Sequence, residues 1–91
     1  MRFKLIHIQI IRHAMKYAGV DYFNNPENLL PPSKDTLSTI LEGDYSELTI
    51  SDAVDELVSN GVLEYYSMHY YLRMKPSFYE SQSYKEIEGI L

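Results

Sequence analysis

A change of hydrophobic period at Asn60-Gly61 is the feature that most limits how this chain of 91 residues can fold. Before it, apolar residues recur at the 3.6-residue spacing of a helix that buries one face: Ile50, Ala53, Val54, Leu57 and Val58. After it, the spacing becomes 2, which is typical of strands. Glycine adopts the left-handed conformation without steric cost, so we expect Gly61 to end the helix. The segment from Thr49 to Met74 therefore predicts a helix and then a pair of strands.

The two ends of this segment have their own signals. Thr49 is the expected N-cap of the helix, because its hydroxyl can accept a bond from a first-turn amide, and Asp52 fits a capping box with it. The strands are expected at 62–66 and 70–74, separated by a short turn. In the second strand, Tyr70, Leu72 and Met74 should face one way and Tyr71 and Arg73 the other.

The remaining elements follow from similar patterns. Residues 3–18 predict a first helix, although Phe3, Leu5, His7 and Gln9 also fit an alternating strand. A proline-containing loop over 21–32 and a helix over 34–42 follow, with Ser33 as N-cap and Leu37, Ile40 and Leu41 buried. A turn is expected at 44–47, with Leu48 leading into the Thr49 cap. The tail, 77–91, predicts a short helix that packs on the first helix or pairs with a second copy.

Composition excludes several classes of protein. The chain has no cysteine, so it has neither a disulfide framework nor a thiolate metal site. Its longest apolar run is far shorter than the roughly 20 residues that cross a bilayer. We therefore expect one domain over residues 1–91, no membrane partner and a cytoplasmic location. Charge is uneven, because residues 1–20 sum to +4, residues 21–60 to −8 and residues 61–91 to −1.

The order of expected elements resembles the winged helix-turn-helix superfamily from Ser33 to Met74. The phrases that carry the resemblance are Leu48-Thr49-Ile50-Ser51, Asn60-Gly61-Val62-Leu63 and Tyr70-Tyr71-Leu72-Arg73. The resemblance implies an α+β fold with three helices, a short antiparallel hairpin and, here, a C-terminal helical tail. It also implies that the helix from Thr49 is the recognition helix, which enters the major groove in DNA-binding members, and that the hairpin is the wing.

The outward face of that helix departs from a DNA-binding pattern. It consists of Ser51, Asp52, Asp55, Glu56 and Ser59. It has no Arg, Lys, Asn or Gln, the side chains that bond base edges. One carboxylate about 7 Å from a phosphate costs roughly 0.6 kcal/mol even at the dielectric of water. The pattern therefore favours recognition of a protein over recognition of DNA.

We expect the partner to be a protein with a basic surface, such as a nucleic-acid-handling machine. The expected partner-binding residues are acids near the recognition helix and side chains of the hairpin: Asp52, Asp55, Glu56, Asp44, Glu47, Tyr66, Met68, His69 and Tyr71. In this mode of action the chain is similar to phage-encoded inhibitors of host defence, anti-CRISPR proteins among them.

Two alternatives stay open. The first is a winged-helix transcriptional regulator that binds duplex DNA through Arg73, Lys75, Lys34 and Ser51, as a homodimer formed by the first helix or the tail. The second is a structural adaptor or dimerisation module. The acids also fit a merely solvated helix face, and the tyrosines fit cross-strand pairs that stabilise a small sheet.

Catalytic and metal-binding patterns are lacking in the sequence. There is no glycine-rich phosphate loop, no G-x-S-x-G and no S-x-x-K. His7 and His13 are six residues apart, which places them on different sides of a helix. We therefore expect no catalytic residue, no metal, no cofactor and no enzyme activity.

Overall fold

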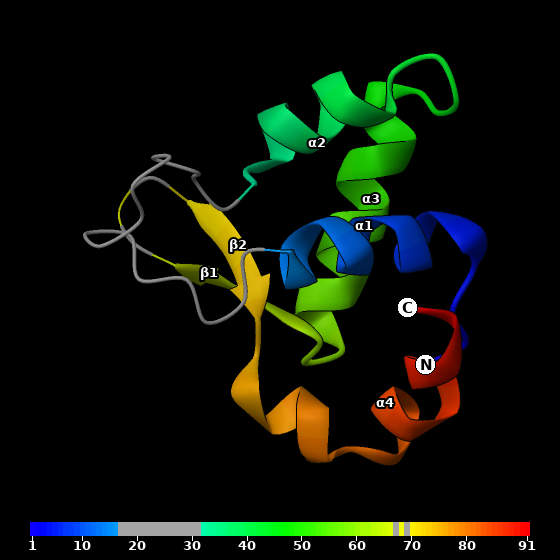
Figure 1. The fold of residues 1–91 in the computed structure, drawn as a ribbon. Coiled ribbons are helices and arrows are strands. Elements are labelled where there is room, and N and C mark those ends of the chain that lie inside the picture. Colours follow the sequence, from blue (N-terminus) through cyan, green and yellow to red (C-terminus); the bar gives the residue numbers. More distant parts are fainter. Residues whose placement is uncertain (17–31, 67, 69) are drawn as a thin grey trace.

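The computed structural model describes residues 1–16, 32–66, 68 and 70–91 (Figure 1). In chain order the elements are α1 (Leu5–Met15), α2 (Lys34–Leu41), α3 (Glu47–Ser59), β1 (Leu63–Tyr66), β2 (Tyr71–Met74), η1 (Pro76–Glu80), α4 (Gln82–Ile87) and η2 (Glu88–Ile90). The strands pair antiparallel, with Leu63 opposite Met74. The expected α+β class, with a hairpin and a helical tail, is confirmed. The expected loop over 21–31 and the turn residues Ser67 and His69 lie outside the described residues.

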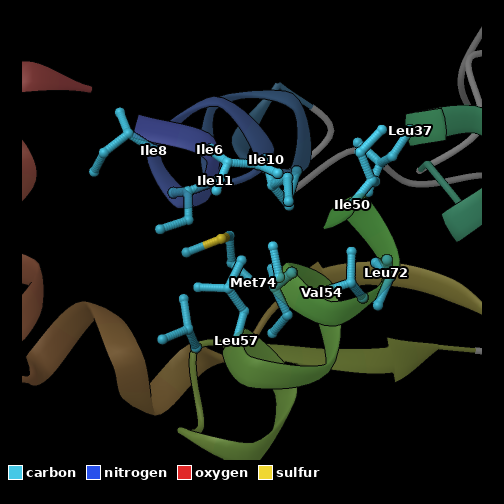
Figure 2. Packing of buried hydrophobic residues seen from close by; sticks show 14 of the residues in the cluster. Ile6, Ile8, Ile10, Ile11, Leu37, Ile50, Val54, Leu57, Leu72 and Met74 are labelled. Carbon is cyan, nitrogen blue, oxygen red and sulfur yellow. The ribbon is translucent and has the colours of Figure 1, made fainter. Parts of the chain in front are cut away.

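The core forms where α1 crosses α3 and the hairpin (Figure 2). Three isoleucines of α1 point toward α3 and β2, namely Ile6, Ile10 and Ile11, whereas the buried Ile8 lies on the other side of the helix. Val54 and Leu57 of α3 and Leu72 of β2 meet them and are fully buried. Isolated helices shorter than about 12–15 residues are marginal in water. These short helices therefore depend on the shared core for their stability.

The start of α3 corrects the predicted cap. Ser46, not Thr49, is the N-cap, and its Oγ accepts a hydrogen bond from the Thr49 amide at 3.2 Å. Both residue types can cap, and a start at Ser46 adds almost one turn and places Glu47 where the helix dipole favours an acid. Glu47 and Leu48 are therefore helical. The prediction of a turn at 44–47 is wrong for Glu47, and the prediction of a linker is wrong for Leu48. The predicted end is confirmed, since Gly61 has a φ of +75°.

The first two helices match their predictions in part. Helix α1 starts at Leu5 rather than at residue 3, and the strand alternative for these residues is wrong. Ser33 caps α2 as predicted, accepting the Thr36 amide at 3.2 Å. Ile40 was expected in the core but is 45% exposed. Only Leu37 and Leu41, one turn apart, face inward from this short helix, and Ile40 lies on its flank.

The hairpin is shorter than predicted. Leu72 and Met74 share the buried face, as expected, while Tyr71 and Arg73 lie on the other. Tyr70 was expected to extend the strand, but its φ of +57° places it in the turn. The carbonyl of Pro32 accepts the Leu72 amide at 2.8 Å, which fixes the start of α2 against β2.

The tail packs on α1 of its own chain. The ring of Phe3 contacts Phe78 edge to face at 6.2 Å, and Phe78 contacts Tyr84 at 5.7 Å. The Arg12 guanidinium donates to the Ile90 carbonyl. The predicted short helix is confirmed as α4, whereas a homodimer remains a prediction. None of the helices in the described part of the chain is long and apolar enough to cross a membrane.

The packing predicts how two leucines differ. Replacing the fully buried Leu72 with Ala should lower the free energy of unfolding by about 2–5 kcal/mol, because it removes buried methyl groups and leaves a cavity. Leu48→Ala is the matched control, since Leu48 is 71% exposed and its replacement should change stability by about 0.5 kcal/mol or less. Urea unfolding measures both. Equal losses would contradict the assignment of Leu72 to the core.

Candidate functional site

The exposed carboxylates of the chain concentrate on α2, α3 and the turn between them. We define the acidic surface by these seven residues: Asp35, Glu42, Asp44, Glu47, Asp52, Asp55 and Glu56. Lys34 is the one basic residue between positions 32 and 60, so this region has a formal charge of −6. A like-signed cluster of this size produces a field that attracts cations and repels phosphates.

The helical period of α3 decides which of its side chains reach solvent. Ile50, Ala53, Val54 and Leu57 fill the inward face. Residues on the opposite side follow the same spacing and are all exposed: Leu48, Asp52, Asp55 and Ser59. The outer face of α3 thus presents a leucine at its start and two carboxylates after it.

Lys34 of α2 neutralises part of this surface. Its Nζ lies 2.6 Å from Oδ1 of Asp55 and 3.1 Å from Oγ of Ser51. The hydrogen bond to Asp55 raises the pKa of Lys34 above its ordinary value, against a smaller lowering by burial. The two residues proposed for DNA contact on α2 and α3, Lys34 and Ser51, are thus bonded to each other, and Lys34 is also bonded to Asp55.

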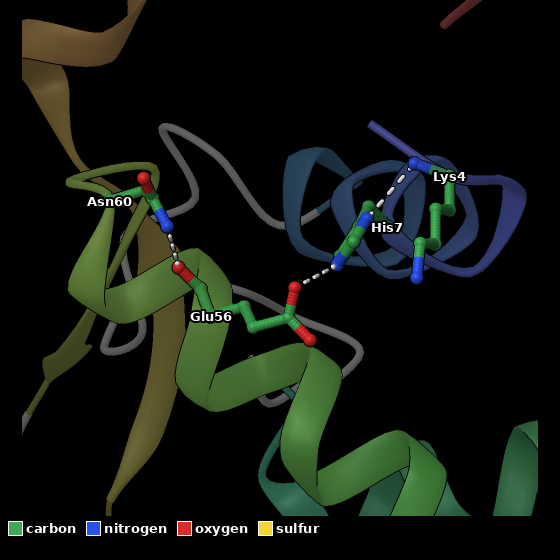
Figure 3. A network of polar contacts seen from close by, with 4 residues as sticks. All are labelled: Lys4, His7, Glu56 and Asn60. Atoms are coloured by element: carbon green, nitrogen blue, oxygen red, sulfur yellow. Dashed lines mark hydrogen bonds and ion pairs between the residues drawn. The ribbon is translucent and has the colours of Figure 1, made fainter. Parts of the chain in front are cut away.

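His7 of α1 contacts the other flank of α3 (Figure 3). Its side chain is buried, and its Nδ1 accepts the Lys4 amide at 3.0 Å. In the neutral ring the proton is therefore on Nε2, which lies 3.3 Å from Oε2 of Glu56. The two atoms are at ion-pair distance, but their alignment does not meet hydrogen-bond geometry, so the contact is chiefly electrostatic.

The surroundings of His7 shift its pKa in opposing directions. Burial has the largest effect and lowers the pKa from the ordinary 6.5. The Glu56 carboxylate raises the pKa, and the Lys4 ammonium lowers it slightly. Glu56 was expected to face a partner, and its carboxylate is exposed but turned toward α1. Its backbone carbonyl also accepts the Asn60 side-chain amide at 2.7 Å.

The other expected partner residues divide into two groups. Among the described residues, Asp52 has no ion-pair partner, and Asp44 and Glu47 are likewise exposed. Tyr66 and Tyr71 lie opposite each other on the hairpin, away from the core, and are half-buried. Met68 is 84% exposed at the tip, and His69 lies outside the described residues.

The remaining DNA candidates lie on β2 and just after it. Nε of Arg73 donates to Oε1 of Glu64 at 2.8 Å, and its guanidinium carbon lies 4.7 Å from the centre of the Tyr66 ring. Lys75 is exposed. The guanidinium of Arg73 is therefore already in contact with two side chains of the neighbouring strand β1.

Sequence reasoning missed several residues of this site. The prediction of a helix start at Thr49 makes Leu48 a linker, and recognition of Ser46 as the cap would have identified Leu48 as a helical residue of this face. A hollow of about 430 Å³ between α2 and the start of α3 was also missed. Its lining is polar and acidic: Asp35, Ser38, Thr39, Glu42, Tyr45 and Glu47. Within the described ranges, no group of three His, Asp or Glu side chains is placed to hold a metal ion.

Comparison of the chain with protein-family models, with curated proteins and with solved structures gives no match.

The buried position of His7 predicts a pH dependence. Because its folded-state pKa is lowered, the unfolded chain binds this proton at higher pH than the folded protein does. Relative to His7→Gln, the wild type should lose stability as the pH falls below 6.5 and show no such loss above it. Glutamine can accept the Lys4 amide and face Glu56 but does not titrate, so it is the matched control.

Urea unfolding of both proteins between about pH 8 and about pH 5 measures the difference. The other histidines and the carboxylates are common to both proteins, so they cancel in the comparison. A wild type that gains stability relative to His7→Gln on acidification would show that attraction to Glu56 outweighs burial.

Proposed function

We propose that this protein has a winged-helix arrangement and acts without catalysis, by binding a protein partner that has a basic surface. In this proposal α3 takes the place of the recognition helix and the hairpin that of the wing. The chain order α1, α2, α3, β1, β2 and the contact of Pro32 with β2 support the arrangement. The acidic surface would then lie where related folds meet DNA.

The composition of the outer face of α3 is the observation that carries the proposal. Base edges are bonded by Arg, Lys, Asn and Gln, and phosphates by Lys and Arg. The exposed positions of this face are Leu48, Asp52, Asp55 and Ser59. Lys34, the one nearby cation in sequence, is bonded to Asp55. A DNA duplex on this face would meet the carboxylates of Asp52 and Asp55, and the Lys34 ammonium beside them is already paired with Asp55.

Leu48 favours a protein as the partner. An exposed leucine beside carboxylates offers an apolar contact surrounded by charged groups, which is the arrangement of many protein interfaces. Complementary charge would steer a basic partner toward this face and raise the association rate, with a strong dependence on salt. Basic protein surfaces commonly hold nucleic acid, so the partner class we propose is a nucleic-acid-handling protein. Small phage-encoded inhibitors are the analogy for this action.

A charge reversal tests the proposal. Asp52→Lys should weaken capture of the partner about tenfold or more, because it places like charges together at the interface. Asp52 is the best site for this change because, unlike Asp55 and Glu56, it has no ion-pair partner among the described residues. Glu86→Lys on α4 is the matched control, since it changes the net charge equally at an exposed site on the tail.

The measurement is capture by immobilised wild type, Asp52→Lys and Glu86→Lys from an extract of cells that make the protein, followed by mass spectrometry. We expect the wild type and Glu86→Lys to capture basic proteins that Asp52→Lys does not capture. Added duplex DNA should displace these proteins from the wild type. Equal capture by the two variants would refute the role of α3.

A further inference from the structure

A second hollow, of about 470 Å³, lies between the first turn of α2 and the hairpin. Ser33, Lys34 and Asp35 line it from α2, and Tyr65 and Tyr70 line it from the hairpin. The two tyrosine rings meet edge to face, with centres 5.9 Å apart. Tyr65 is 42% and Tyr70 69% exposed, so both rings offer surface to a ligand. The hollow borders the acidic surface, because Asp35 belongs to both.

The backbone at Tyr70 is strained. Its φ of +57° is a left-handed conformation that a bulky side chain rarely adopts and that glycine adopts readily. Such strain persists only where the surrounding structure imposes it, and it gathers at functional sites. Here it holds a large aromatic ring against Tyr65, at a turn position where a glycine would be less strained.

The charges around the hollow favour a cation over an anion. The ammonium of Lys34 is paired with Asp55 at 2.6 Å and bonded to Ser51. Ser33 Oγ is occupied by the Thr36 amide, and Asp35 already supplies an acid to the first turn of α2. The groups that would bind an anion, the Lys34 ammonium and the N-terminus of α2, therefore already have partners. A cation would find the Asp35 carboxylate and the exposed parts of two tyrosine rings.

We propose that this hollow binds an arginine side chain of the partner, with the guanidinium stacked on a tyrosine ring and paired with Asp35. The proposal rests on the proposed function, since it names one contact of the basic partner. Guanidinium is planar and weakly hydrated, so it stacks on aromatic rings better than ammonium does. The same hairpin holds such a pair on its other face, where Arg73 lies over Tyr66 at 4.7 Å.

Two synthetic peptides test the proposal with the full chain. They have the same glycine spacing and carry either four arginines or four lysines. Binding is followed at low salt by the backbone amide signals of the ¹⁵N-labelled protein. We expect the arginine peptide to bind about three- to fivefold more tightly, and to shift the signals of Asp35, Tyr65 and Tyr70.

Two variants distinguish the effect of losing the Tyr70 ring from an effect on the stability of the fold. Tyr70→Phe keeps the ring and should bind the arginine peptide like the wild type. Tyr70→Gly removes the ring and relieves the strain, so it should lose the preference for arginine while its urea midpoint stays equal or rises. Equal binding of both peptides by wild type and Tyr70→Gly would overturn the arginine site and leave the acidic surface intact.

Two further outcomes are decisive. Binding of neither peptide would overturn the proposed function together with the arginine site, because no basic ligand would then be held. Shifts of Asp35, Tyr65 and Tyr70 with inorganic phosphate alone would identify an anion site and overturn the arginine assignment.

Discussion

The packing of Ile6, Ile10 and Ile11 of α1 against α3 and β2 is the interaction on which the rest of this structure depends. It joins elements that are each too short to be stable alone. It also decides the surface, because once Ile50, Val54 and Leu57 face inward, Leu48, Asp52 and Asp55 must face outward. The acidic character of the outer face thus follows from the same helical register that builds the core.

Two of the carboxylates on α3 are paired with side chains of the same chain. Lys34 holds Asp55 on one flank of α3, and His7 faces Glu56 on the other. These contacts connect α2 and α1 to α3 and reduce the negative field at its two sides. Asp52 and Glu47 remain exposed without such partners in the described part of the chain. In the proposed function, the acids without such partners, Asp52 and Glu47 of α3 among them, contribute more to the attraction of a basic partner than the paired acids do.

Much of the fold and most acids of the acidic surface could be predicted from local patterns, but the contacts that pair some of these acids could not. The period over Ile50 to Val58, the stop at Gly61 and the cap at Ser33 each depend on neighbouring residues, and each is confirmed. The predicted start of α3 at Thr49 is wrong because Ser46 and Thr49 are both good caps, and the local sequence does not decide between them. The pairs of His7 with Glu56 and Lys34 with Asp55 join residues distant in sequence, so no local pattern indicates them.

The most direct test of the central claim is titration of a labelled mixed-sequence DNA duplex with the wild-type protein, first at low salt and then at physiological salt. Non-specific DNA binding by proteins with a basic face has dissociation constants of about 10⁻⁴–10⁻⁶ M at physiological salt, and it tightens as salt falls. Our account predicts no binding at micromolar protein, even at low salt. Binding that weakens steeply as salt rises would contradict it and favour a DNA-binding regulator.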